Sequence, residues 1–191
     1  MTAAPAKTSP PPVQQFPVFS RLLHWLMAAM VLTMLGIGFT MVASIRHYHS
    51  LISIHRPLGI CIFLLVIVRY INRRLHPPPP FPPTVSPAEQ KIAIASERLL
   101  YALMFLMPLV GWGMLSAARY PIQLVGPLWL PPILPHSPML YFVLRKTHTI
   151  LAYLLFATFL AHLSAVLFHT FVIRDRLFSR MAPWKTRQNA N

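Results

Sequence analysis

The sequence predicts an all-α integral membrane protein in which four helices cross the bilayer as one bundle. Hydrophobic residues make up 55% of the 191 residues and charged residues only 10%, and the mean hydropathy is +0.56. About 20 helical residues cross a hydrocarbon core of about 30 Å. Four apolar blocks reach that length, at about 22–44, 51–71, 99–118 and 147–173. One bundle accounts for a chain of this length and leaves no room for a second domain.

The bundle is expected to occupy residues 21–181. Residues 1–20 are Pro-rich and predict a disordered N-terminal tail, and residues 182–191 predict a basic C-terminal tail. The first block lacks a small-residue cleavage site, so we interpret it as a retained span and not as a signal peptide. The stretch "HPPPPFPPTVSP" at 76–87 predicts a stiff linker between the second and third helices. Residues 118–138 are too broken by proline to span and are expected to lie in the interface over the outer end.

The basic residues predict the orientation of the bundle. With the N-terminus inside, 12 of the 17 Lys and Arg residues lie on the cytoplasmic side, where membrane proteins concentrate positive charge. Both termini are therefore expected in the cytoplasm. The three acids Glu89, Glu97 and Asp175 fall on that side as well. The outer face is left with five cations and no acid, and these cations are Arg46, Arg56, Arg119, Arg145 and Lys146.

The apolar run 145–169 contains three histidines at intervals of 14 and 7 residues: His148, His162 and His169. At 100° per residue, 14 residues return to nearly the same side of a helix, about 21 Å further along its axis. His169 falls close to the same stripe. One helical face thus carries an imidazole near each end, which predicts two sites stacked through the depth of the membrane.

Histidines from other helices match these two depths. His24, early in the first helix, pairs with His162 near the cytoplasmic side, and His55, early in the second, pairs with His148 near the outer side. Zinc requires four protein ligands, or three and a water, whereas each depth offers two imidazoles and no well-placed carboxylate. A macrocycle that supplies four further nitrogens fits better. The pairs therefore predict axial ligation of two haem irons, stacked across the membrane.

A structural interpretation remains open for single histidines, because a membrane histidine often only bonds to a neighbouring helix. The depth pairing and the 14-residue spacing favour haem for the four named residues. Ordinary solvated histidines are expected at or beyond the interface, at His47, His49, His76, His136 and His169. The single Cys61 excludes a disulfide within the chain, and no C-x-x-C-H motif is present for covalent haem attachment.

Several segments match a known family in order and spacing. They are "LLHW" at 22–25, "HRPLG" at 55–59, "VRYINR" at 68–73, "LLYALMFLMPLVGW" at 99–112, "GPLWLP" at 126–131, "THTILAYLLFATFLAH" at 147–162 and "LFSRMAP" at 177–183. From about Arg21 to Pro183 the sequence resembles the bacterial di-haem cytochrome b561 family. Within that family it is most similar to the small enzymes that oxidise superoxide and reduce ubiquinone.

The resemblance implies that His24, His55, His148 and His162 ligate two b-type haems in a multi-pass protein of the bacterial inner membrane. This agrees with the depth pairing. The chain departs from the family at Glu97, in "ASERLLY", where members often carry a histidine. The departure leaves the four ligands unchanged and affects only a proton or quinone role tied to that position.

Two stacked haems predict an electron path between the membrane faces, with membrane-soluble ubiquinone as the expected acceptor. The unopposed outer cations would attract a small anion, and superoxide is the expected donor. Arg145 and Lys146 beside His148, and Arg56 beside His55, are the predicted steering residues. Pairing with haem propionates is their alternative role.

For the quinone head group, His169 is the first candidate and Arg69 a weaker one. His169 lies near the ligand stripe, the resemblance points to the same position, and an imidazole can hydrogen-bond a quinone carbonyl and pass a proton.

The alternative function is an electron-transfer subunit that links a dehydrogenase, a hydrogenase or a soluble cytochrome to the quinone pool. Short loops argue mildly against a large partner, and no obligate protein partner is expected. A purely structural or transport bundle would leave the paired histidines unexplained. The basic clusters are interpreted as topology anchors, and no nucleic-acid partner is expected.

Overall fold

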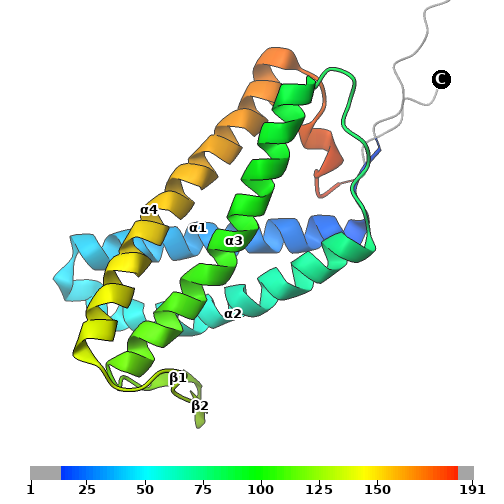
Figure 1. Ribbon diagram of the computed structural model, residues 1–191. Coiled ribbons are helices and arrows are strands. Elements are labelled where there is room, and N and C mark those ends of the chain that lie inside the picture. The colour runs from blue at the N-terminus through cyan, green and yellow to red at the C-terminus, as the bar shows by residue number, and fades with distance from the viewer. Residues whose placement is uncertain (1–13, 185–191) are drawn as a thin grey trace, which may run out of the picture.

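The computed structural model describes residues 14–184, and residues 1–13 and 185–191 lie outside this description. Its long helices are α1 (Val18–Ala43), α2 (Tyr48–Leu75), α3 (Pro87–Ala117) and α4 (Pro138–Phe168) (Figure 1). A single 3₁₀ turn, Ile45–His47, connects α1 to α2. All four helices are long and apolar enough to cross a membrane. The predicted fold class, a four-helix membrane bundle, is therefore confirmed.

The helices form two antiparallel pairs. α1 packs against α2, α3 packs against α4, and α2 joins the pairs by packing on α3. The pairs approach each other where α1 turns into α2 and α3 leads to α4, and they diverge toward the other end (Figure 1). Following the predicted orientation, we call the converging end the outer end and the diverging end the inner end.

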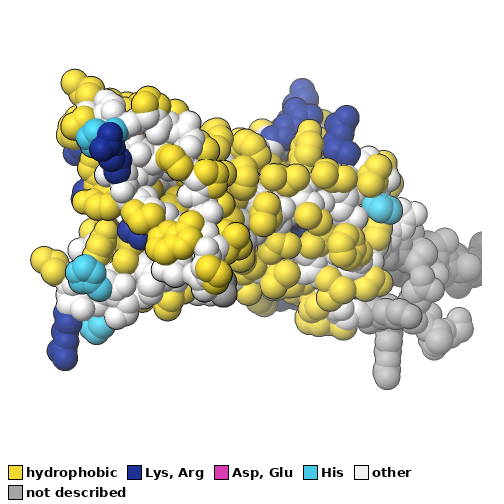
Figure 2. Space-filling model, turned by 90° about the horizontal axis from the view of Figure 1, so that it is seen from below, with side chains coloured by type: hydrophobic (Ala, Val, Ile, Leu, Met, Phe, Trp, Pro, Cys, Tyr) yellow, Lys and Arg dark blue, Asp and Glu magenta, His cyan; other side chains and the backbone are white. Residues whose placement is uncertain are grey.

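The surface of the bundle is largely apolar, as expected for contact with lipid. Large side chains such as Phe39 and Tyr153 are 76% and 72% exposed, whereas Leu103 and Val66 in the interior are each 2% exposed. Figure 2 shows hydrophobic side chains over the middle of one face, and Lys, Arg and His side chains at the outer end on its left. This distribution matches a protein with a membrane-embedded middle.

The helices extend beyond the apolar blocks from which they were predicted. α3 begins at Pro87 and not near residue 99, because Ser86 and Glu89 form a reciprocal capping box and Pro87 suits the first turn. α4 begins at Pro138 and not near residue 147, after the cap Ser137. Hydropathy alone misses such polar or half-polar first turns because they lie outside the hydrocarbon core.

The inner end is closed by the two ends of the described chain. Arg21 is 5% exposed, and its Nη1 atom donates to the carbonyl of Ala182 at 2.8 Å. Phe16 N–H donates to the carbonyl of Arg180 at 3.0 Å, and Gln15 bonds to the Ser179 carbonyl at 2.8 Å. Residues 14–20 are therefore ordered here, in contrast to the disordered tail expected for 1–20. The expected tails at 1–13 and 185–191 fall outside the described residues.

The linker 76–86 follows α2 without helix or strand, as its prolines predicted. It contributes to the closure of the inner end, because the Arg180 guanidinium donates to the carbonyls of Pro79 and Pro80. Val85 is 4% exposed and anchors the linker.

The outer segment contains a short antiparallel hairpin that sequence analysis did not predict, formed by β1 (Ile122–Val125) and β2 (Leu128–Leu130). Gly126 turns the chain with φ +53°. Ile122 is 3% exposed, and β1 packs against α2, whereas Leu128 and Trp129 are exposed. The Trp112 indole donates to the Pro131 carbonyl at 2.9 Å and holds the segment to α3.

Candidate functional site

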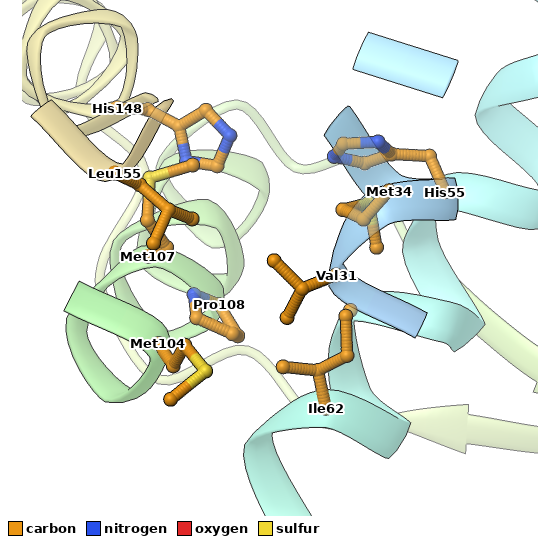
Figure 3. Close-up of a pocket in the computed structure, with 10 residues that line it drawn as sticks. Val31, Met34, His55, Ile62, Met104, Met107, Pro108, His148 and Leu155 are labelled. Atoms are coloured by element: carbon orange, nitrogen blue, oxygen red, sulfur yellow. The ribbon is translucent and has the colours of Figure 1, made fainter. Parts of the chain in front are cut away.

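Two of the predicted ligands face each other at the outer end. His55 extends from α2 and His148 from α4, and their ring centroids are 6.3 Å apart with an interplanar angle of 64°. Figure 3 shows the two imidazoles directed toward one another across a pocket. The pocket is otherwise apolar, lined by Val31, Met34, Gly59, Ile62, Met104, Met107, Pro108 and Leu155.

The imidazole nitrogens in this pocket lack ordinary partners. The Nδ1 atoms of His55 and His148 are buried and form no hydrogen bond within the described part of the chain. The backbone carbonyl of Met107 lies beside His148, without closing a bond of normal geometry. A buried polar atom that stays unpaired is costly, so two such rings side by side indicate a ligand that completes the site.

Gly111 on α3 is what allows His148 to lie in this position. A Cβ atom at residue 111 would be 3.3 Å from His148 Cε1 and 3.5 Å from its Nδ1. The glycine therefore lets the imidazole lie directly against the α3 backbone. Gly113, two residues further along α3, instead accommodates Leu134, whose Cδ1 would be 2.9 Å from an added Cβ.

The outer pair suits a haem iron. Metal–imidazole bonds are about 2 Å long, so two imidazoles on opposite sides of one metal have centroids about 6 Å apart. The separation of His55 and His148 is of this size. Among residues 14–184 no group of three or more His, Cys, Asp or Glu side chains could hold a bare metal ion. Two facing imidazoles in an apolar pocket thus fit a macrocycle that brings its own equatorial nitrogens.

The predicted inner pair, His24 on α1 and His162 on α4, comes from the two helix pairs that diverge toward this end. Arg69 on α2 lies beside His24, with 3.2 Å between Arg69 Nη2 and His24 Nδ1. The same guanidinium donates to the Ser20 carbonyl at 3.1 Å and lies 5.9 Å from the Tyr101 ring centre. Arg69, the weaker quinone candidate, is therefore a neighbour of His24.

The Arg69 contact determines which His24 nitrogen is free. A guanidinium can only donate, so Nδ1 accepts and the proton of the neutral imidazole resides on Nε2. Metal-bound imidazoles usually donate their second N–H to an acceptor. Ligation of iron by His24 Nε2 thus requires Nδ1 to carry the proton and Arg69 to turn away from it.

Glu97, the residue at which the chain departs from its family resemblance, forms an ion pair at the inner end. Arg73 Nε and Nη2 donate to the two carboxylate oxygens of Glu97 at 2.7 and 2.9 Å. This two-point contact between α2 and α3 has the geometry of strong guanidinium–carboxylate pairs. Within residues 14–184, the neighbouring guanidinium of Arg69 forms no ion pair with a carboxylate.

The predicted steering residues lie at the outer end. Arg145 and Lys146 are exposed, and Arg56 is half-buried with an unpaired Nε. Arg145 donates to the Tyr141 hydroxyl at 2.9 Å, and Lys146 Nζ lies 5.8 Å from the Phe142 ring centre. Neither ion pair found in the described chain involves an outer cation.

His169 differs from the solvated histidine expected at its position. It is 7% exposed, and its Nδ1 donates to Asp175 Oδ2 at 2.6 Å. Sequence reasoning did not identify Asp175 as its partner. The available signal was composition, because Asp175 is one of only three acids in the chain and follows His169 by six residues.

Comparison with known proteins identifies the family to which the chain belongs. The family model for prokaryotic cytochrome b561 matches residues 15–184. Cytochrome b561 homolog 2 of Escherichia coli (strain K12) is 28% identical over 171 residues, covering 88% of this chain and 91% of the relative. The probable superoxide oxidase CybB of Yersinia pestis is 27% identical over 170 residues, covering 85% and 93%. The chain therefore belongs to the prokaryotic cytochrome b561 family and is a multi-pass, haem b electron-transfer protein of the bacterial inner membrane.

Proposed function

We propose that this chain takes electrons from superoxide at the outer face and passes them to ubiquinone in the membrane. The observation that carries the proposal is the facing pair His55 and His148, which lies at the same end as the unopposed cations. The name of the Yersinia pestis relative, a probable superoxide oxidase, supports the choice of donor.

The proposed haem ligands are the two histidine pairs, His55 with His148 and His24 with His162. When bound, haem supplies the one-electron chemistry that no side chain of the chain provides. The outer pair is supported by its ring separation and by its unpaired nitrogens. The inner pair is supported by the 14-residue spacing from His148 to His162, about 21 Å along α4. This spacing supports one site near each face.

The outer cations would attract superoxide to the site of electron entry. The described acids lie on α3 and after α4, toward the inner end, so nothing nearby neutralises Arg145, Lys146 or Arg56. A positive field at an entrance concentrates small anions and raises their association rate. Arg145 and Lys146 precede His148 by three and two residues, and this nearness in sequence supports their role in steering.

We place the quinone head group at His169, near the inner pair. His169 follows His162 by seven residues, which is about 10 Å along the helix axis. Because Asp175 occupies Nδ1, Nε2 is the nitrogen left to bond to a quinone carbonyl. His169→Ala should lose quinone reduction while both haems remain bound. His76→Ala, an exposed histidine at the same end, is the matched control and should reduce quinone normally.

The deciding experiment is stopped-flow mixing of the oxidised holoprotein with superoxide, with and without ubiquinone, followed by haem absorbance. We expect fast haem reduction without quinone and rapid reoxidation when quinone is present. A protein with both haems in place that does not react with superoxide would instead be an electron-carrier subunit for another donor.

A further inference from the structure

Three segments outside the four long helices meet at the inner end, where the two helix pairs diverge (Figure 1). They are residues 15–16 before α1, residues 79–85 of the linker and residues 178–184 after α4. Hydrogen bonds join the first segment to the third and the third to the second. We call these three segments together the inner cover.

Two buried arginines hold the inner cover in place. Arg21 is 5% exposed and Arg180 is 6% exposed. Arg21 donates to the Ala182 carbonyl at 2.8 Å, and Arg180 donates to the carbonyls of Pro79 and Pro80. Neither arginine forms an ion pair with a carboxylate in the described chain. Because arginine stays protonated throughout the physiological pH range, these bonds keep the cover closed at any such pH.

Phe16 supplies an apolar contact at the centre of the inner cover. Its ring centre is 5.7 Å from Arg180 Cζ and 5.9 Å from Arg73 Cζ, and its N–H donates to the Arg180 carbonyl at 3.0 Å. Arg180 Cζ is also 5.8 Å from the ring centre of Phe81 in the linker. Contacts between guanidinium groups and rings are strongest where water is excluded. Phe16 thus connects the cover to α2 through Arg73.

The inner cover extends to His24, the proposed inner ligand on α1. The Trp25 indole donates to the Met181 carbonyl at 2.8 Å. Its ring meets the His24 imidazole edge-on, with centroids 5.6 Å apart and an interplanar angle of 80°, and meets the Phe178 ring at 6.1 Å. Arg21 precedes His24 by three residues, which is about 4.5 Å along the helix axis. The cover therefore lies about one helical turn from His24, on its water-facing side.

We propose that the inner cover excludes water-soluble electron acceptors from the inner site and so restricts this site to acceptors that dissolve in lipid. The rate of electron transfer falls steeply with distance, so a layer of protein over the inner ligand slows any acceptor that stays in water. An acceptor in the membrane approaches from the side and does not cross the cover. The inference rests on the proposed function for its acceptor, ubiquinone, and assigns the residues that select this class.

Charge alone would favour the opposite selectivity. The predicted orientation places 12 of the 17 Lys and Arg residues on the inner side, and these cations would attract an anionic acceptor from the water. Ferricyanide is such an acceptor, and it takes one electron from one reduced haem to become ferrocyanide. Slow oxidation by ferricyanide at this end would therefore come from the protein layer and not from repulsion.

The test compares the two ends of the holoprotein in vesicles of opposite orientation. The membranes contain no quinone, the haems are reduced to completion with limiting dithionite, and ferricyanide is then added outside by stopped flow. We expect fast haem oxidation when the outer end faces outward and oxidation at least tenfold slower when the inner end does. Equal rates from the two ends of the wild-type protein would overturn the proposal.

Phe16→Ala should open the inner cover, because it removes the ring that Arg73 and Arg180 contact. Oxidation by ferricyanide from the inner end should rise several-fold, and the backbone amides of residues 178–184 should exchange with deuterium faster. Phe19→Ala is the matched control, since it truncates an exposed phenylalanine on the nearby first turn of α1. It should change neither measurement. Phe16→Ala with faster amide exchange but unchanged oxidation would contradict the barrier.

A milder variant applies if Phe16→Ala loses haem. Gln15→Ala removes the bonds to the carbonyls of Ser179 and Trp184 and leaves the aromatic contacts in place, so it should raise the inner rate in the same direction. Ubiquinone reduction should stay close to the wild-type rate in both variants. Its loss with both haems retained would assign the cover to the quinone site and overturn the proposal.

The ferricyanide assay uses neither superoxide nor ubiquinone, so its failure differs from that of the proposed function. A protein that shows the difference between its two ends but does not react with superoxide would overturn the proposed donor and support the barrier. A protein that passes electrons from superoxide to ubiquinone but is oxidised equally fast from both ends would overturn the barrier alone.

Discussion

The imidazoles of His55 and His148 face each other from α2 and α4 with their ring centroids 6.3 Å apart, and the Nδ1 atom of each is buried without a hydrogen-bond partner. This relationship joins the two helical pairs at the outer end. It also explains why two imidazoles stay in an apolar pocket, because a shared metal would make use of both rings.

The first prediction concerns the separation of the two haem sites. His55→Ala and His148→Ala should each lose one haem per chain, and the same one, because each removes an axial ligand of the outer iron. His24→Ala and His162→Ala should lose the other. Haem-to-protein ratio and the visible spectrum measure the outcome, with exposed His49→Ala as a control that keeps both haems. Loss of the outer haem from His24→Ala would show that the pairing is wrong.

The second prediction uses Gly111. Gly111→Ala places a methyl group 3.3 Å from His148 Cε1, which is tighter than ordinary van der Waals contact, so the imidazole must shift by a few tenths of an ångström. We expect a changed spectrum or a lower occupancy of the outer haem only. Gly36→Ala is the matched control in another helix, because nothing lies within 4 Å of its added Cβ.

Both glycine variants gain about 1 kcal/mol of helix propensity, so any difference between them reports the contact with His148. Equal spectra and equal haem content in Gly111→Ala and Gly36→Ala would show that His148 does not hold the outer haem in this position.

The third prediction concerns Arg69 beside His24. Arg69→Gln removes a half-buried positive charge and offers an amide oxygen that can accept from Nδ1–H, so the inner haem should stay bound. Its reduction potential should fall by tens of millivolts, since a nearby cation favours the reduced state and about 59 mV corresponds to a tenfold change for one electron. Potentiometric titration of both haems measures the shift.

A double variant serves as the control for this charge effect. Arg73→Gln combined with Glu97→Gln removes the neighbouring ion pair, and thus no net charge. It should shift the inner potential much less than Arg69→Gln does. Shifts of equal size in the two variants would assign the effect to packing and not to the charge of Arg69.

The membrane spans could be predicted because hydropathy depends only on composition along the chain, and α1 to α4 each cover most of one expected block. The first residues of α3 and α4 could not be predicted from hydropathy. Capping residues, Ser86 and Ser137, fix these helix starts outside the apolar stretch. The hairpin β1–β2 is likewise decided by tertiary contacts, in particular by burial of Ile122 against α2.

The approach of His148 to His55 was predictable from depth, because helical geometry fixes the position of each residue along the axis. The partners of the other site residues were not. Asp175 reaches His169 only because the chain reverses after α4. It does so through the π-helical turn His169–Ile173 and through Arg174 and Arg176, whose backbones adopt the left-handed conformation. Neither feature has a clear sequence signal. The contact of Arg69 with His24 depends equally on the rotation of α2 relative to α1, which spacing within one helix does not determine.

The last prediction separates an enzyme that selects superoxide from a general electron carrier. Lys146→Glu should lower the second-order rate of haem reduction by superoxide several-fold and reduce its dependence on salt, because it reverses an exposed charge two residues from His148. The field of the outer cations reaches about 8–10 Å at physiological ionic strength and shortens as salt is added. In the wild type the rate should therefore fall as ionic strength rises, whereas reduction by a neutral donor should not. Arg145→Glu should act in the same direction.

Arg74→Glu is the matched control, because it reverses an exposed charge at the inner end. It should leave the superoxide rate and its salt dependence close to those of the wild type. The reason is that the two ends are separated by far more than a screening length. A superoxide rate that ignores both salt and the outer reversals would show that the cations have another role, such as pairing with haem propionates.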